Sequence, residues 1–275
     1  MEVVRPRSVE EWLDRARPLL LADEARHNLI LGLAGTLRDH PEYYPDFGLW
    51  LVEADGAAVA AALRTRPHNL VLGRGPDRAV ALLARSIEEE LPGVVGAVPE
   101  VDAFVTAAGR DAVARVRQRI FALRAVIAPP RPPGRARPAT VADRELLLRW
   151  WREFVVEAIG DEDPDPDGVA RNVDHRLGAR DAGIALWEDE GRPVSAVGWG
   201  APTPSGIRIG PVYTPPEARG RGYASALTAH VSQEQLDRGR AFCFLYTDLA
   251  NPTSNKIYAA IGYEPVADSI EYAFT

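Results

Sequence analysis

The sequence predicts a mixed α/β fold that is built twice, as two domains in tandem, and three observations support it. Strand-like and helix-like segments alternate through all 275 residues. Residues 129–138 contain five prolines, which favour a stiff, extended connector. The order of elements before this connector returns after it. We therefore expect an N-terminal domain over residues 1–128, a linker over 129–138 and a C-terminal domain over 139–275.

The composition is typical of a globular protein, with 46% apolar and 26% charged residues. A net charge of −7 argues against nucleic acid as a main partner. No apolar run approaches the ~20 residues of a membrane span, and the first residues lack a signal-peptide pattern, so we expect no membrane partner and a cytoplasmic location. The single Cys243 excludes an internal disulfide, and the five scattered histidines have no metal-ligand spacing, so no metal is expected.

The N-terminal half reads as a strand, two helices, a hairpin and then alternating strands and helices. Ser8, followed three residues later by Glu11, is a capping box that begins the first helix. Asp55-Gly56 is a typical hairpin turn. The predicted ranges are a strand over 1–7, helices from 8 and over 29–37, hairpin strands over 48–56 and 57–63, a strand over 69–73, a helix over 78–91, a strand over 93–98, a helix over 101–108 and a strand over 121–127.

The C-terminal half repeats this order. The predicted ranges are a strand over 139–141, a helix over 143–157, a hairpin over 184–199, a strand over 207–213, a helix from 222, a strand over 242–247 and a short helix from 251. Asn251 suits the N-cap of that last helix, Pro252 its first position and Gly262 the position just beyond its end.

The segment Arg219–Ala224, which reads Arg-Gly-Arg-Gly-Tyr-Ala, lies between a predicted strand and a helix N-terminus. Free backbone N–H groups and the helix dipole make such a place an anion site. Gly220 and Gly222 permit close approach of a ligand, and Arg219 and Arg221 carry charge that matches phosphate oxygens. An ordinary turn is the alternative. The pattern favours a cradle for a pyrophosphate.

These motifs together resemble the GCN5-related N-acetyltransferase (GNAT) superfamily, over roughly residues 139–275. The first match is Arg219, Gly220, Arg221, Gly222, Tyr223 and Ala224, which correspond to the family's pyrophosphate loop. The second match is Asn251, Ser254, Tyr258 and the pair Gly262-Tyr263. The resemblance implies two GNAT-like domains in tandem, with acetyl-coenzyme A as the acyl donor.

The resemblance also assigns roles around the thioester. An amine attacks the thioester directly, without a covalent enzyme intermediate. Val212, Tyr213 and Thr214 correspond to the strand edge that pairs with pantetheine. Asn251, together with Ser254, corresponds to the contacts with the pantetheine arm. Tyr258 corresponds to the general acid that donates a proton to the leaving thiolate, and a buried structural tyrosine is the alternative.

The general base stays open. The strand over 207–213 carries no carboxylate. Asp248 is a candidate base or water-positioning group, against a role as a cap of the following helix. Glu153 and Glu157 lie on a helix expected to line the acceptor site, against a role as surface charges. Glu217 reads as a loop acid, and a neutral amine would need no base.

The two halves differ at the loop. In the N-terminal half Pro76 removes a backbone donor and Asp77 places a negative charge where a phosphate would sit, so we expect no acyl-coenzyme A there. That half would form one wall of the acceptor groove or a dimer contact. Residues 160–168 hold five acids, which either steer a cationic amine or form a solvated loop.

The sequence thus predicts an N-acyltransferase that moves an acetyl group from acetyl-coenzyme A to a primary amine. The acceptor is a small-molecule amine or a peptide N-terminus. A non-catalytic, coenzyme A-responsive sensor or scaffold is the alternative. The identity of the acceptor and the acyl chain length stay open.

Overall fold

A computed structural model describes residues 1–159 and 162–275. The chain forms two compact units, which we describe separately. Unit 1 comprises Met1–Ile120 and Pro265–Thr275, and unit 2 comprises Phe121–Glu264. This division differs from the predicted one, because the predicted linker 129–138 belongs to unit 2 and the end of the chain belongs to unit 1. The physical reason is that the last strand pairs antiparallel with a strand of the first half, Tyr272 opposite Val94.

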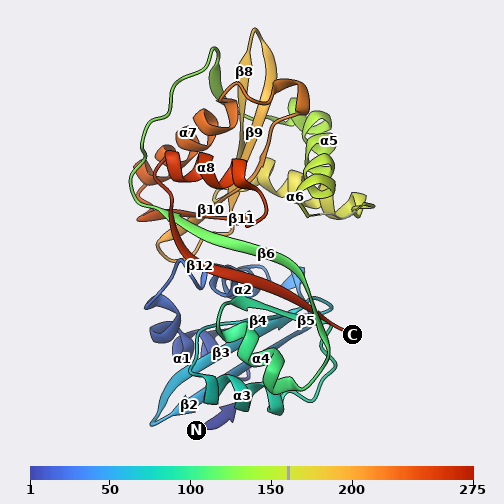
Figure 1. The fold of residues 1–275 in the computed structure, drawn as a ribbon, viewed down its shortest axis with the longest axis vertical. Coiled ribbons are helices and arrows are strands. Elements are labelled where there is room, and N and C mark those ends of the chain that lie inside the picture. The colour runs from blue at the N-terminus through green and yellow to red at the C-terminus, as the bar shows by residue number, and fades with distance from the viewer. Residues whose placement is uncertain (160–161) are drawn as a thin grey trace. The chain divides into compact units, whose positions relative to one another are not determined.

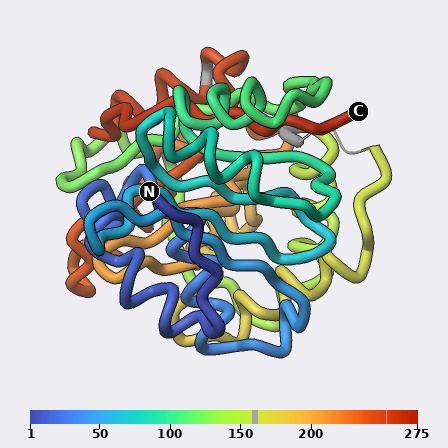
Figure 2. The backbone as a smooth tube through the Cα atoms, turned by 90° about the horizontal axis from the view of Figure 1, so that it is seen from below, coloured from blue at the N-terminus to red at the C-terminus, as the bar shows by residue number. Residues whose placement is uncertain are grey.

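Unit 1 is a mixed sheet with helices on both faces (Figure 1). Its strands follow the order β1-β2-β3-β4-β5-β12, and of the pairs in this order only β4–β5 is parallel. Figure 2 follows the chain of β1 to β5 from the dark blue N-terminus to teal, and the last segment, which contains β12, is red. The elements are β1 Glu2–Val4, α1 Val9–Leu21, α2 Asn28–Asp39, η1 Pro41–Tyr43, β2 Phe47–Ala54, β3 Ala57–Thr65, β4 Leu70–Leu72, α3 Asp77–Ser86, β5 Gly93–Ala97, α4 Glu100–Ala108, β6 Ala112–Leu123 and β12 Glu264–Phe274. The division between the units falls within β6, after Ile120, and within β12, after Glu264.

Alternation along β2 builds two cores in unit 1. Trp50 and Val52 join the core under α3 and α4, while Leu49 and Leu51 join the core under α1 and α2. This is the period of two that a strand buried on both faces requires. The predicted cap at Ser8 is confirmed, since its side chain accepts a hydrogen bond from the Glu11 N–H.

Unit 2 has the same order of helices and strands. Within it, β11-β10-β9-β8-β7 are neighbours, and only β10–β11 is parallel. The elements are β7 Arg135–Pro138, η2 Val141–Asp143, α5 Arg144–Phe154, a π-helical turn Val155–Ile159 (η3), α6 Pro166–Gly178, β8 Gly183–Asp189, β9 Arg192–Gly200, β10 Gly206–Tyr213, η4 Pro216–Ala218, α7 Tyr223–Asp237, β11 Phe242–Asp248 and α8 Pro252–Ala260. The mixed α/β fold class is confirmed.

The sheet of unit 2 also separates two cores. One core joins α7 and α8 to the sheet through residues such as Leu227, Leu245 and Ile261. The other joins α5 and α6 to the opposite face through Leu147, Trp150 and Val173, among others. Figure 1 shows α5 and α6 on one side of β8 and β9, and α7 and α8 on the other. Cys243 is buried in the first core.

Several predicted elements are corrected. The strand predicted over 121–127 runs instead over Ala112–Leu123. The strand predicted over 139–141 begins earlier, as Arg135–Pro138 of the expected linker, because these residues pair with β8. Residues 141–143 form a 3₁₀ turn capped by Thr140. Neither α6 nor β12 was predicted. None of the helices among the described residues has the length and apolar character needed to span a bilayer.

Candidate functional site

The C-terminal part of strand β10 is separated from the neighbouring strand β11. Gly206–Arg208 pair in parallel with Phe242–Phe244 of β11. On the β9 side the register shifts between Ile209 and Val212, which marks a bulge. Within the part of the chain that the structure describes, Ile209–Tyr213 have no partner on β11. This edge of β10 is therefore available to a ligand, and bulges are common beside active sites.

The loop between β10 and α7 turns on two glycines. Gly220 has φ of +76° and Gly222, the N-cap residue of α7, has φ of +82°. A Cβ atom built on either residue would meet no atom within 4 Å. Glycine is therefore required here by the backbone conformation, and the space in front of it is open. The first N–H groups of α7 have no partner within the helix, which leaves them for an anion.

The corresponding loop of unit 1 is closed by its own packing. A Cβ atom on Gly75 would lie 2.7 Å from the Cβ of Ala60. The Arg74 N–H donates to Nε2 of His27 at 3.0 Å, and Pro76 occupies the N-cap position of α3. The expectation that this loop holds no acyl-coenzyme A stays a prediction, and this packing agrees with it.

The arginines of the unit 2 loop differ in their surroundings. Nε of Arg219 donates to the Thr214 carbonyl at 2.8 Å, and Nη2 lies 2.6 Å from Glu157. Arg221 is exposed. Tyr223 is buried, and its hydroxyl donates to Asp189, which raises the pKa of the phenol against the opposing effect of Arg221. The side chain of Tyr223 is thus used in packing, while its backbone begins α7.

Tyr213, predicted only as part of the strand edge, also has a bound hydroxyl. It donates to Glu153 at 2.8 Å and lies 3.3 Å from Glu157. Burial raises the pKa of this phenol above its usual value, and the hydrogen bond to Glu153 raises it further. The π-helical turn that follows α5 carries Glu157, and such turns are frequent at functional sites. The spacing of the two glutamates, four residues apart on one helical face, was the available signal.

Tyr258 lies on α8, on the sheet face opposite Tyr213. It belongs to the core under α7 and α8, with 8% of its surface exposed. Its ring meets that of Tyr263 edge-on, with centroids 6.0 Å apart. Burial raises the pKa of Tyr258 to about 12, so its hydroxyl stays protonated at neutral pH. A general acid needs this protonated state.

The residues that begin α8 are engaged in local hydrogen bonds. Oδ1 of Asn251 accepts from the Ser254 N–H at 3.1 Å, which confirms its expected place as N-cap. Oδ1 of Asp248 accepts from the Ala250 N–H at 2.8 Å. The Asn255 side chain donates to the Asp248 carbonyl at 3.3 Å. These contacts favour the capping interpretation of Asp248, while a contact of Asn251 and Ser254 with a ligand stays a prediction.

Two further arginines lie on the α5 and α6 side of β10 and were not predicted. Arg176 of α6 donates to the Gly210 carbonyl at the bulge, and Arg208 projects from β10 over the rings of Phe244 and Tyr246. No signal in the sequence distinguished them among the many arginines of the chain.

The acidic loop expected over 160–168 lies partly outside the described residues, which exclude Gly160 and Asp161. Of the remainder, Asp165 caps α6, accepting from the N–H groups of Asp167 and Gly168. Among residues 1–159 and 162–275, no cluster of three metal-ligating side chains occurs.

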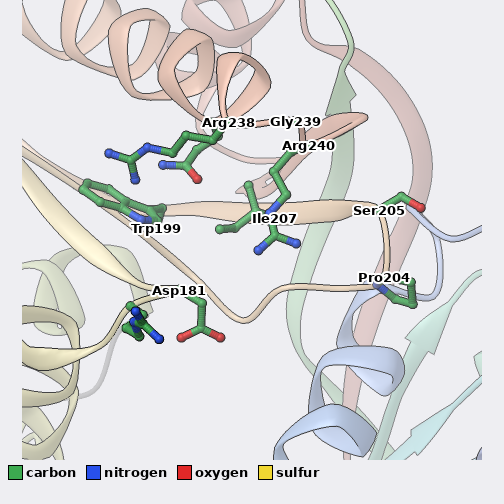
Figure 3. A pocket seen from close by; sticks show the side chains of 10 residues that line it. Asp181, Trp199, Pro204, Ser205, Ile207, Arg238, Gly239 and Arg240 are labelled. Atoms are coloured by element: carbon green, nitrogen blue, oxygen red, sulfur yellow. The ribbon is translucent and has the colours of Figure 1, made fainter.

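A separate cavity of about 320 Å³ opens at the start of β10, away from the bulge (Figure 3). Figure 3 shows Arg238 above the ring of Trp199, with Arg240 beside Ile207 and Asp181 below. The guanidinium of Arg238 lies 5.8 Å from the Trp199 ring centroid. None of the residues predicted from the sequence lines this cavity.

Comparisons with known proteins agree with the expected resemblance. Residues 187–272 match the model of the family described as FR47-like protein. A GNAT-family acetyltransferase from Colwellia psychrerythraea superposes with a TM-score of 0.62 at 13% identity, covering 100% of both chains. A GCN5-related N-acetyltransferase from Sphaerobacter thermophilus gives 0.61 at 17% identity, covering 99% of this chain and 95% of the other.

A tandem GNAT protein from the clavulanic acid biosynthesis pathway superposes with a TM-score of 0.60 at 17% identity, covering 100% of this chain and 98% of the other. The curated proteins contain no match to this chain. The chain therefore has the fold of GNAT acetyltransferases, and the expected resemblance to the GNAT superfamily is confirmed for the fold.

Proposed function

We propose that unit 2 binds acetyl-coenzyme A and transfers its acetyl group to a primary amine. The observation that carries this proposal is the junction between β10 and α7. A strand edge without a partner on β11 leads into a loop whose two glycines, Gly220 and Gly222, open a helix N-terminus to an anion. We expect a pantetheine chain along the edge and a pyrophosphate at the loop.

The main-chain groups would do most of the binding. The N–H groups of Gly222, Tyr223 and Ala224, with Gly220 before them, would hold the pyrophosphate oxygens. The backbone of Val212–Thr214 would pair with pantetheine and polarise the thioester carbonyl. Arg221 is exposed beside the loop and adds positive charge without a competing ion pair among the described residues.

The two faces of the sheet would then take different roles. Tyr258, on the α8 face, would donate its proton to the sulfur as the thiolate leaves. The amine would approach from the α5 face, where Glu153 and Glu157 surround the hydroxyl of Tyr213. A glutamate there would orient the amine and take its proton. Asp248, the other proposed base, holds the turn before α8 with its carboxylate.

A coupled assay tests this function. Full-length protein is incubated with acetyl-coenzyme A and a panel of primary amines, and free thiol is measured together with consumption of the amine. We expect thiol and acetylated amine in equal amounts. Acetyl-coenzyme A that raises the melting temperature while no amine is consumed would favour the sensor. No binding of acetyl-coenzyme A at all would contradict both.

A further inference from the structure

The side chain of Arg176 is held against the sheet of unit 2 with its charge poorly compensated. Its Nη1 donates to the Asn172 side chain at 3.1 Å, and its Nη2 donates to the Gly210 carbonyl at 3.3 Å. Its Nε is buried and has no hydrogen-bond partner among the described residues. Both acceptors are neutral, and none of the described carboxylates forms an ion pair with this guanidinium.

A second positive charge lies nearby. Burial lowers the pKa of Arg176 to about 10, and the charge of Arg208 lowers it further in the same direction. Arg208 is oriented by two aromatic rings, with its guanidinium carbon 5.2 Å from the Tyr246 ring centroid and 6.0 Å from that of Phe244. Arg176 therefore carries an electrostatic cost, because its guanidinium is buried, partly unsatisfied and close to a second positive charge, and an anion bound to it would lower that cost.

The sheet beneath Arg176 is shaped to receive it. A Cβ atom on Gly198 of β9 would lie 3.1 Å from Nε of Arg176 and 3.0 Å from the Gly210 oxygen. Gly200, directly opposite Arg208, would place a Cβ atom 3.9 Å from Nη2 of Arg176. Two glycines spaced by two residues share one face of the strand, so β9 places no side chain under the guanidinium at these two positions. The absence of side chains on these two glycines lets the guanidinium of Arg176 lie against the sheet.

We propose that Arg176, with Arg208 beside it, binds a carboxylate on the acceptor amine, so that the acceptors of this chain are amino acids rather than simple amines. The inference rests on the proposed function. Nη1 and Nη2 of Arg176 each donate one hydrogen bond, so each keeps a second N–H, and together they present the fork of donors that a carboxylate accepts. The bond from Arg176 to Gly210 places this fork beside the bulge of β10.

The separation from the thioester is suitable for a short acceptor. Gly210 precedes Val212, the first residue of the proposed thioester-binding edge, by two strand positions, which is roughly 7 Å. An acceptor whose amine and carboxylate are separated by one to three carbon atoms would reach from the fork toward this edge. The α5 and α6 face would then contribute both the anchor and the groups that orient the amine.

The test uses pairs of amines that differ by a carboxylate: glycine and methylamine, β-alanine and ethylamine, 4-aminobutyrate and propylamine. We measure kcat/KM for each with wild type, Arg176→Gln, Arg176→Lys and the control Arg180→Gln, which removes an exposed arginine near the end of α6. In wild type we expect at least one carboxylated member to exceed its partner by about tenfold or more, as one charge-assisted contact implies. In Arg176→Gln the ratio of kcat/KM between the carboxylated amine and its partner should fall to near one, because the KM for the carboxylated amine rises. Arg176→Lys should give a ratio between those of wild type and Arg176→Gln.

Two further measurements separate this role from a structural one. Arg176→Gln should keep its melting temperature, its affinity for acetyl-coenzyme A and its kcat/KM for the simple amines. If the variant instead lowers kcat/KM equally for both members of each pair, or if wild type uses both equally, the inference is wrong.

If wild type consumes no amine, the proposed function fails, and a binding measurement still decides the inference. Calorimetry with N-acetylglycine, N-acetyl-β-alanine and 4-acetamidobutyrate in the presence of coenzyme A should then give binding to wild type and none to Arg176→Gln. Equal binding to both proteins, or to neither, would overturn the carboxylate site itself.

Discussion

Arg219 and Glu157 form an ion pair at 2.6 Å that joins the loop before α7 to the turn after α5. Both side chains are nearly half exposed, so the pair contributes little to stability, at most about 1 kcal/mol. The guanidinium of Arg219 therefore has two possible partners, Glu157 and the pyrophosphate expected beside it. The pair therefore connects the loop expected to bind the cofactor with the α5 side of the site.

We predict that Arg219→Gln and Glu157→Gln change the affinity for coenzyme A in opposite directions. Removal of the guanidinium should raise the Kd roughly tenfold, because a charge-assisted contact with phosphate is lost. Removal of the glutamate charge should lower the Kd, because Arg219 is then free for the phosphate. Calorimetry with coenzyme A measures both without catalysis. A higher Kd in both variants would mean that the ion pair itself shapes the loop.

Tyr258→Phe should lower kcat by about 10²–10⁴ while leaving the Kd for coenzyme A unchanged, because only proton donation is lost. Tyr263→Phe is the matched control, since it removes another buried hydroxyl of the same core, one bonded to Ser232 at 2.8 Å. We expect the control to lose about 1 kcal/mol of stability and to keep its kcat. Equal kcat in wild type and Tyr258→Phe would exclude the assigned acid.

The pH dependence of kcat follows from the same residue. Because burial raises the pKa of Tyr258 to about 12, the phenol is protonated through the whole neutral range. Deprotonation of Tyr258 should therefore cause no fall in kcat between pH 7 and about pH 10. A fall that begins near pH 9 in wild type and is absent in Tyr258→Phe would show that the hydroxyl titrates earlier, in a more polar setting.

Local signals made much of the fold predictable. Both hairpins turn on an acidic residue followed by glycine, each with positive φ, namely Asp55-Gly56 and Glu190-Gly191. The caps at Ser8 and Asn251 were likewise fixed by residues three positions apart. These features depend on neighbours in the chain, so the sequence contains the information needed to place them.

The missed features depend on partners that are distant in the chain. Strand β12 mixes acids with apolar residues, and its pairing with β5 joins Tyr272 to Val94. The glycine loop of the site was found from its pattern, but the ion pair of Arg219 with a residue 62 positions earlier was not. Arg176 was missed for the same reason, since only the folded sheet shows the two glycines of β9 beneath it.

Gly222→Ala should weaken coenzyme A binding about tenfold, because an L-residue at φ of +82° costs roughly 1–2 kcal/mol and the loop would relax away from its open shape. Gly56→Ala is the matched control: it has φ of +78°, equally open surroundings, and a place in unit 1. Both variants should lose stability, and only Gly222→Ala should lose affinity. Gly222→Asn should bind better than Gly222→Ala, because asparagine tolerates this conformation. Unchanged affinity in Gly222→Ala would argue against the cradle.

The neutral imidazole of His27 holds the loop before α3 in unit 1 by a hydrogen bond. Nδ1 lies 2.9 Å from the Leu20 carbonyl, to which it donates, and Nε2 accepts from the Arg74 N–H. A protonated ring would present a second N–H to Arg74 and lose this bond. Burial lowers the pKa of His27 and the charge of Arg26 acts in the same direction, while the hydrogen bond to Leu20 and the charges of Asp23 and Glu100 oppose this shift.

Unit 1 should therefore lose stability in mild acid. The pKa of His27 in the folded state lies below the unfolded value of about 6.5, so the neutral ring contributes its full stability above pH 6.5. That contribution declines as the pH falls toward the lowered pKa, by at most about 1.4 kcal/mol per pH unit. Urea unfolding of wild type and His27→Gln at pH 7.5, 6.5 and 5.5 should show a smaller pH dependence in the variant. His230→Gln, which replaces an exposed imidazole, should follow wild type, and an identical pH dependence in all three proteins would exclude His27 as the group that titrates.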